Sequence, residues 1–241
     1  MLNTTQIWSI WFVAALITVA AWGPSASAKV PIYLDLCERA VLHEERAQRI
    51  PSHLLHAISI AESGRWNKAR KENVAWPWTV TSGGKGQYYP TKVAAIRAVQ
   101  HLQRQGIRNI DVGCMQVNLK YHPKAFKSLD EAFDPTANAR YAGRFLAQLR
   151  QEKRSWVQAV KHYHSATRSL HVRYRAKVYK IWRAERRKVR NERIAKQREN
   201  RRRNAARYSR AERILAQNSV SAKRLDWLDR TTRRLFDNWA D

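Results

Sequence analysis

The sequence predicts a mainly α-helical domain that contains one small β-hairpin and is followed by a basic C-terminal arm. Apolar residues recur at helical spacing through most of the first 182 residues. One glycine-rich segment, residues 75–89, instead has the alternation and the turn of a hairpin. After Arg183 apolar residues become rare, and Arg and Lys alternate with Glu. The length of 241 residues suffices for one well-buried domain with extra segments.

An uncharged apolar segment opens the chain. Residues 1–28 contain no charged side chain, and the apolar run of residues 7–22 is followed by a small-residue cleavage motif at residues 26–28. This pattern is typical of a secretory signal peptide, although no Lys or Arg precedes the run. The alternative is an uncleaved membrane anchor, for which the run is slightly short. Both interpretations predict that the rest of the chain is exported. In that part, we expect residues 29–182 to form the domain and residues 183–241 to form the arm.

Export gives the two cysteines a specific meaning. An even cysteine count in an oxidising compartment favours pairing, so we predict a disulfide between Cys37 and Cys114. The alternative is two separate buried thiols.

The first two predicted helices lie near the start of the domain. Residues 33–50 place Leu34, Cys37 and Val41 on one face. Pro51 sits where a second helix can begin, because the first turn does not need its missing N–H. That helix carries an apolar stripe that leads to Glu62, and we expect it to end at Gly64.

Further helices follow the predicted hairpin. In the hairpin, alternating residues lead into a turn at residues 82–86. The segment of residues 91–106 is amphipathic and ends at Gly106, and its expected inward residues are Val93, Ile96, Val99 and Leu102. Three more helices are expected, at residues 129–133, 135–151 and 155–164.

Glu62 is a lone carboxylate at the C-terminal end of its apolar helical stripe. The negative end of the helix dipole and desolvation both favour the protonated carboxyl group, so both raise its pKa. A carboxyl group that is protonated near neutral pH can act as a general acid on a glycosidic oxygen. The alternative is an ordinary surface residue at a frayed helix end.

Two later segments supply polar and aromatic side chains that suit the same chemistry. Residues 111–123 contain Met115, Gln116 and Asn118 among small and apolar residues. The two amides can hydrogen-bond sugar hydroxyl or acetamido groups, and methionine offers an adaptable apolar contact. Residues 159–166 place Tyr163 at the end of a helix.

Three short motifs, in this order, resemble the lytic transglycosylase SLT domain, which has a lysozyme-like fold. Glu62-Ser63 corresponds to the E-S pair of that family, residues 113–116 to its G-L-M-Q segment and residues 162–166 to its A-Y-N-A-G segment. Cys114 replaces the usual leucine, and the Asn and final Gly of the third motif are missing. The resemblance covers roughly residues 34–182. Within the family, the chain is similar to an exported subgroup from Gram-negative bacteria, and this similarity implies a periplasmic location.

The resemblance implies a reaction with one acid and no metal or cofactor. Glu62 would protonate the oxygen that links N-acetylmuramic acid to N-acetylglucosamine. The carboxylate would then act as base while the muramyl C6 hydroxyl attacks C1, which gives a 1,6-anhydro product without water. Tyr163 would orient the Glu62 carboxyl group. The expected substrate contacts are Ser63, Met115, Gln116, Asn118 and Tyr163.

Two further sets of residues bear on this reaction. A hydrolytic, lysozyme-like muramidase would use a second carboxylate. Asp111 is the candidate, but we prefer for it the role of a turn or cap residue before Gly113. One or two of four aromatic residues in the hairpin segment are expected to stack on sugar rings, the others packing inward. These four are Trp76, Trp78, Tyr88 and Tyr89.

The formal net charge of +27 predicts attraction to polyanions. In the arm we expect either a long solvated helix or a partly disordered segment, ending in an apolar stripe of Leu225, Leu228, Leu235 and Trp239. Besides peptidoglycan glycan strands, candidate partners are anionic lipid, a wall polymer or a secretion or flagellar assembly, and a non-catalytic scaffold is the alternative function. Nucleic acid is not expected, because export separates the protein from it and base-stacking aromatics are nearly absent from the arm.

Overall fold

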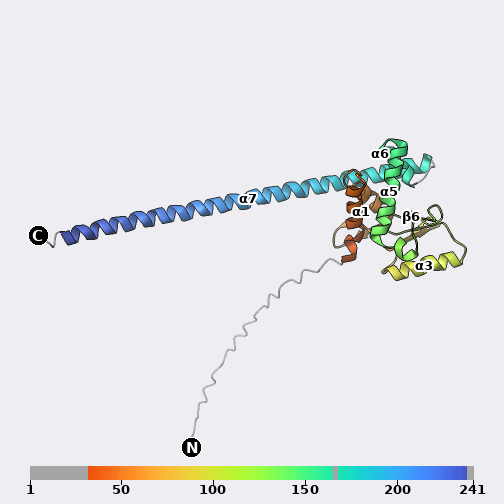
Figure 1. Ribbon diagram of the computed structural model, residues 1–241, viewed down its shortest axis with the longest axis horizontal. Coiled ribbons are helices and arrows are strands. Elements are labelled where there is room, and N and C mark those ends of the chain that lie inside the picture. The colour runs from red at the N-terminus through yellow and green to blue at the C-terminus, as the bar shows by residue number, and fades with distance from the viewer. Residues whose placement is uncertain (1–31, 165–167, 238–241) are drawn as a thin grey trace, which may run out of the picture. The chain divides into compact units, whose positions relative to one another are not determined.

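Helices form most of the protein in the computed structural model, which describes residues 32–164 and 168–237 (Figure 1). The predicted mainly α fold with a small β part is confirmed, and each helix expected before residue 165 is present within a few residues of its predicted bounds. The predicted signal peptide lies outside the described residues. Within them, no helix combines the length and apolarity needed to cross a membrane. The helices are a 3-10 helix at Ile32–Asp35, α1 (Leu36–Ala47), α2 (Leu54–Ser63), α3 (Lys92–Arg104), α4 (Leu129–Ala132), α5 (Pro135–Lys153), α6 (Trp156–His164) and α7 (Arg168–Asp237).

Side chains cap the starts of three of these helices. Thr91, Ser128 and Asp134 each accept a hydrogen bond from a backbone N–H in the first turn of α3, α4 and α5. On α3, Val99 is fully buried as expected. Val93 is 56% exposed, so its predicted inward position is wrong; it lies in the first turn of that helix.

Two small antiparallel sheets lie between α2 and α5 in the sequence. One pairs β1 (Gly64–Asn67) with β2 (Glu72–Ala75). The other has the order β4-β3-β5-β6, formed by β3 (Thr79–Ser82), β4 (Lys85–Tyr88), β5 (Ile110–Val112) and β6 (Val117–Asn118). The predicted hairpin is β3–β4, where Gly83 and Gly84 both have positive φ, as a tight two-residue turn requires. The other strands are too short for alternation to reveal them.

Helix α2 lies at the centre of the domain. Every residue of α2 except Glu62 is buried, and α1 and α7 pack against it. The buried Glu45 of α1 caps its start, because the Glu45 carboxylate accepts the backbone N–H groups of His53 at 2.7 Å and His56 at 3.0 Å. The α2 backbone is therefore fixed at its start, and the helix carries Glu62 to the edge of the core.

The basic arm is the continuation of α7. Its first turns pack on α2 and α6, where Tyr174 and Val178 are buried. The helix continues without a break through residue 183, where we predicted the arm to begin. What changes near this residue is the packing of the side chains. Every side chain at residues 186–232 is exposed apart from the half-buried Ser209 and Thr231. The arm is thus helical; of the predicted apolar stripe, Leu225 and Leu228 are exposed and Trp239 lies outside the described residues.

Candidate active site

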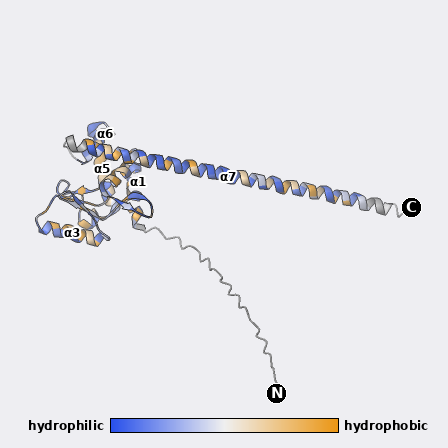
Figure 2. Cartoon of the chain, turned by 180° about the vertical axis from the view of Figure 1, so that it is seen from behind, coloured by the Kyte–Doolittle hydropathy of each residue, from blue (hydrophilic) through white to orange (hydrophobic). Residues whose placement is uncertain are grey.

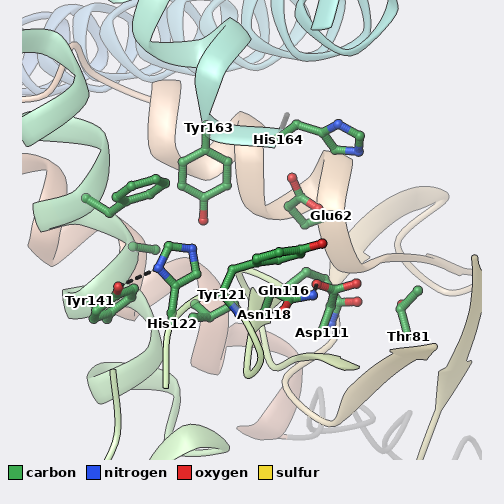
Figure 3. A pocket seen from close by; sticks show the side chains of 13 residues that line it. Glu62, Thr81, Asp111, Gln116, Asn118, Tyr121, His122, Tyr141, Tyr163 and His164 are labelled. Carbon is green, nitrogen blue, oxygen red and sulfur yellow. Dashed lines mark hydrogen bonds between the residues drawn. The ribbon is translucent and has the colours of Figure 1, made fainter. Parts of the chain in front are cut away.

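A pocket with a volume of about 370 Å³ opens beside the C-terminal end of α2 (Figure 3). Its walls come from α2, the four-stranded sheet, the segment after β6, α5 and α6. The pocket contains two carboxyl groups among aromatic and amide side chains. Its lining residues are Glu62, Thr81, Asp111, Gln116, Val117, Asn118, Tyr121, His122, Tyr141, Ala142, Phe145, Tyr163 and His164.

Glu62 is held by a residue of α7. The Tyr174 hydroxyl donates a hydrogen bond of 2.6 Å to Glu62 Oε1. Desolvation by burial raises the pKa of Glu62 to about 7; the Tyr174 hydrogen bond and the Lys177 charge oppose this shift, and the Asp111 charge adds to it. The carboxyl group is therefore protonated in a large fraction of molecules near neutral pH, as a general acid requires.

Helix α7 also fixes the end of α2 that carries Glu62. The Lys177 ammonium donates to the Ala61 carbonyl oxygen at 2.5 Å, which satisfies one of the last carbonyl groups of α2. The Tyr174 ring stacks on His164 with 4.6 Å between ring centroids. Burial raises the pKa of Tyr174 well above its usual value, so its hydroxyl remains a donor in neutral solution.

The expectation that Tyr163 orients Glu62 needs correction. Tyr163 lines the pocket, but its hydroxyl donates to the Met115 carbonyl oxygen at 3.0 Å. That bond ties the end of α6 to the turn between β5 and β6, and the hydroxyl bonded to Glu62 belongs to Tyr174. Sequence reasoning missed Tyr174 because 112 residues separate it from Glu62 and it lies outside the three motifs.

Ser63 and Met115, both expected to contact substrate, do not line the pocket. Both are fully buried. Ser63 Oγ lies 2.7 Å from the Cys114 carbonyl oxygen and 3.2 Å from that of Ser59, so it joins α2 to the turn between β5 and β6. The Met115 side chain belongs to the hydrophobic core. Both side chains therefore have structural roles. Successive residues of a helix are rotated by about 100°, so neighbours in a motif such as Glu62 and Ser63 can face different surroundings.

Gln116 and Asn118, the two amides expected to contact substrate, both line the pocket, but their hydrogen bonds differ. Gln116 Nε2 donates to the carbonyl oxygens of Thr79 and Gly113 at 3.2 and 3.0 Å, and within the described chain no hydrogen bond engages its Oε1. That oxygen can accept from a sugar hydroxyl or amide. Asn118 is fully engaged: Nδ2 donates to Asp111 and Asn109, and Oδ1 accepts two backbone N–H groups. One of these hydrogen bonds holds the Asp111 carboxyl group in place.

Asp111 faces the pocket from a strand and is not a turn or cap residue, so the preferred expectation for it is wrong. It lies on β5, paired with Thr81 and Asn118. Asn118 Nδ2 donates to Asp111 Oδ1 at 2.8 Å. Burial raises the pKa of Asp111, and this hydrogen bond acts in the opposite direction. The pocket therefore combines two carboxyl groups with raised pKa values.

The aromatic side chains in the pocket are not those of the hairpin segment, which were expected to stack on sugar rings. None of Trp76, Trp78, Tyr88 and Tyr89 lines the pocket. Tyr121, which is 68% exposed, stands at its edge. Its position five residues after Gln116, within the segment of residues 111–123, was the available signal in the sequence.

Two histidines also line the pocket. His122 Nδ1 lies 2.7 Å from the Tyr141 hydroxyl, and its ring contacts Phe145. Burial lowers the pKa values of His122 and His164, which favours neutral imidazoles. In the part of the chain that the structure describes, no three His, Cys, Asp or Glu residues are placed to hold a metal ion.

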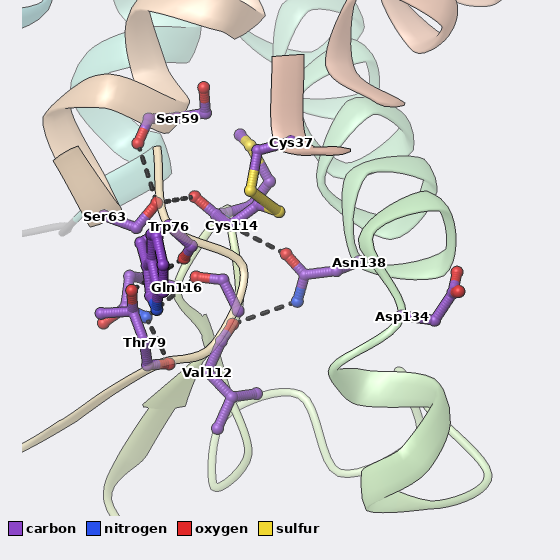
Figure 4. Close-up of a disulfide and its surroundings, with 12 residues drawn as sticks. Cys37, Ser59, Ser63, Trp76, Thr79, Val112, Cys114, Gln116, Asp134 and Asn138 are labelled. Atoms are coloured by element: carbon purple, nitrogen blue, oxygen red, sulfur yellow. Dashed lines mark hydrogen bonds between the residues drawn. A yellow bond between two sulfur atoms is a disulfide. The ribbon is translucent and has the colours of Figure 1, made fainter. Parts of the chain in front are cut away.

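The turn between β5 and β6 is fixed from two sides (Figure 4). Cys114 forms the predicted disulfide with Cys37 of α1. From α5, the buried Asn138 accepts the Met115 N–H at 2.9 Å and donates to the Val112 and Ala132 carbonyl oxygens at 3.0 Å. Gly113 has φ +83°, and a Cβ there would lie 2.4 Å from the Asn138 amide nitrogen, so only glycine fits. These contacts fix the turn that places Gln116 in the pocket wall.

Replacing Tyr174 with phenylalanine should reduce turnover about tenfold or more, because a hydrogen bond to a charged group contributes about 1.5–3 kcal/mol. The lost bond stabilises the carboxylate, so its removal raises the pKa of Glu62 and moves the alkaline limb of the activity profile to higher pH. The measurement is turnover against pH, with Tyr179→Phe on the same helix as the matched control. Profiles of wild type and Tyr174→Phe that coincide would refute the contact's role.

A family model described as Transglycosylase SLT domain matches residues 39–180. The search of curated proteins and the search of solved structures returned no match. The matched region starts within α1 and ends within α7, so it contains Glu62, Gln116, Tyr163 and Tyr174. It spans more than half of the chain and includes every wall of the pocket. The chain belongs to the transglycosylase SLT domain family.

Proposed function

We propose that the protein is a peptidoglycan lytic transglycosylase that cleaves the β-1,4 bond between N-acetylmuramic acid and N-acetylglucosamine. Membership of the SLT family supports this activity at the level of the family. The observation that carries the proposal is the state of Glu62: a carboxyl group held by Tyr174, with a pKa of about 7, at the wall of an open pocket.

In the proposed reaction Glu62 acts as both acid and base. The protonated carboxyl group gives its proton to the glycosidic oxygen as the bond from that oxygen to C1 of the muramyl residue breaks. The resulting carboxylate takes the proton of the muramyl C6 hydroxyl as O6 bonds to C1, which forms the 1,6-anhydro ring and restores protonated Glu62. Tyr174 stabilises the transient carboxylate by its 2.6 Å hydrogen bond. Gln116 Oε1 is the proposed acceptor for a substrate N–H or hydroxyl.

We also propose that this reaction takes place in the periplasm after removal of residues 1–28. The cleavage motif before Lys29 supports export. The Cys37–Cys114 disulfide supports an oxidising compartment, since reducing compartments seldom retain such bonds.

Hydrolysis of the same bond is the second candidate function, and Asp111 favours it. Asp111 supplies a second carboxyl group to the Glu62 pocket, where a hydrolase would use it to activate water or to stabilise the sugar cation. The reaction product separates the two functions. Transglycosylation leaves 1,6-anhydromuramyl ends, whereas hydrolysis leaves reducing ends.

The test is digestion of purified peptidoglycan by the mature chain, residues 29–241, with the released muropeptides identified by mass spectrometry. We expect anhydromuramyl ends that appear in proportion to the enzyme added. Reducing ends would assign the hydrolytic reaction instead. If wild type released no muropeptide, the enzyme proposal would fail and the non-catalytic scaffold would take its place.

Asp111→Asn should keep the anhydro product and more than about a tenth of the wild-type turnover, because transglycosylation needs one acid. Its amide oxygen can still accept from Asn118, so the pocket is preserved. Removing the Asp111 charge lowers the pKa of Glu62, which moves the alkaline limb of the activity profile to lower pH. Turnover and product ends measured between pH 5 and 9 check both expectations. A loss of cleavage as large as that caused by Glu62→Gln would instead make Asp111 essential.

A further inference from the structure

A row of arginines on α7 lies beside the turn between α1 and α2. Arg183, Arg186, Arg190 and Arg193 are three or four residues apart, so they share one face of the helix. We call these four residues the arginine row. With Arg187 and Val189 they line a groove of about 510 Å³ whose other wall is formed by Ser52 and His53.

The charges of the arginine row are not compensated. Across residues 32–164 and 168–237, no ion pair involves any of the four. The neighbouring acid, Glu185, lies 3.9 Å from His56, and Lys188 pairs with Glu72. Like charges at this spacing repel one another and destabilise a helix.

The groove is nevertheless a fixed part of the fold. Trp182 Nε1 donates to the Ser52 carbonyl oxygen at 2.8 Å and holds α7 against the turn. His53 Nδ1, in the groove wall, is buried and has no hydrogen-bond partner within the described chain. Guanidinium groups that have no ion-pair partner and line a groove favour an anionic ligand.

Beyond the row, positive charge surrounds the helix on every side. Between residues 186 and 213, 13 of 28 residues are Lys or Arg and three are Glu. Successive residues turn by about 100°, so these side chains leave no continuous apolar face, and hydrophilic residues predominate here in Figure 2. A helix that lies on a membrane keeps one face apolar. A linear polyanion can contact all sides, so it fits this stretch better than a bilayer does.

Helix α7 leads from Tyr174, which contacts Glu62, to the arginine row. Arg183 follows Tyr174 by nine residues, roughly 14 Å of helical rise, and Arg193 follows it by 19 residues, roughly 28 Å. A glycan in the pocket would bring its peptide branches within reach of α7, and these branches carry carboxylates that match guanidinium forks. We propose that the arginine row binds the peptide carboxylates of the peptidoglycan whose glycan enters the Glu62 pocket. This inference rests on the proposed substrate of that pocket.

The test measures binding of residues 29–241 to insoluble peptidoglycan sacculi in the Glu62→Gln background, which prevents cleavage. The row variant carries Arg183→Gln, Arg186→Gln, Arg190→Gln and Arg193→Gln, since glutamine keeps helix propensity. The matched control removes the same charge from four exposed arginines elsewhere: Arg97, Arg104, Arg108 and Arg144, each changed to glutamine. Circular dichroism and melting temperature confirm that both variants are folded.

We expect the row variant to bind sacculi about tenfold more weakly at low salt, and the control variant to lose less than about threefold. Sacculi whose carboxylates have been amidated should remove the difference between the row variant and its parent. Equal losses in both variants, or an undiminished difference on amidated sacculi, would overturn the proposal. So would a row variant that loses binding to phosphatidylglycerol vesicles but not to sacculi. Binding is measured without cleavage, so the two proposals can fail independently. If wild type released no muropeptides, the proposed reaction would be refuted, but the binding comparison would still test the arginine row.

Discussion

Replacing Glu62 with glutamine should reduce peptidoglycan cleavage by about 10²- to 10⁴-fold, the usual contribution of a general acid–base group. Glutamine has nearly the same shape and can accept the Tyr174 hydrogen bond, but it has no proton to give to the glycosidic oxygen. Release of muropeptides per enzyme, measured over a range of enzyme concentrations, gives the ratio.

Stability measurements separate this loss from unfolding. Burial raises the pKa of Glu62 from 4.5 to about 7, so between these values the folded protein binds the proton more tightly than the unfolded chain does. Wild-type stability should therefore decline as the pH rises from about 4.5 to 7. Glu62→Gln removes this decline, so the variant should melt at or above the wild-type temperature at pH 8. Retained cleavage in a well-folded Glu62→Gln variant would exclude Glu62 as the acid.

Removing the disulfide should lower the free energy of unfolding by about 4 kcal/mol. The bond closes a loop of 77 residues, and restricting so long a loop strongly reduces the entropy of the unfolded chain. For a protein of this size the melting temperature should fall by roughly 8–16 °C. Urea unfolding of Cys37→Ala/Cys114→Ala beside wild type measures the difference.

Loss of the disulfide should also affect the pocket before the domain unfolds. Cys114 lies two residues before Gln116, and its carbonyl oxygen accepts from Ser63 beside Glu62 (Figure 4). Reductant should lower the stability of wild type by a similar amount. It should not change the stability of the double variant, which is therefore the internal control. Wild type that unfolds at the same urea concentration with and without reductant would show that the bond contributes nothing to stability.

The sequence was sufficient to predict the helices and the raised pKa of Glu62. Amphipathic spacing acts within one helix, so a single segment reveals it. The position of Glu62 at the end of an apolar stripe explains its raised pKa, which the structure supports. The cysteine pairing followed from the even cysteine count in a chain that we expected to be exported.

Assignment of individual motif residues was less successful, because a motif does not show which way each side chain faces. Ser63 follows Glu62 directly, yet it turns into the core and bonds to Cys114. Met115 precedes Gln116, yet it is buried while Gln116 lines the pocket. Residues brought in by distant helices were missed for another reason: Tyr174 meets Glu62 only through packing of α7 on α2. Such contacts arise from tertiary structure and have no local pattern.

The central claim is that Glu62 is a carboxyl group poised to give a proton near neutral pH. Its ionisation can be followed directly by ¹³C NMR of the glutamate carboxyl carbons, with the Glu62 signal assigned by its absence in Glu62→Gln. The account predicts a titration midpoint of about 7, displaced upward in Tyr174→Phe and downward in Asp111→Asn. A midpoint near 4.5 that neither substitution moves would contradict it.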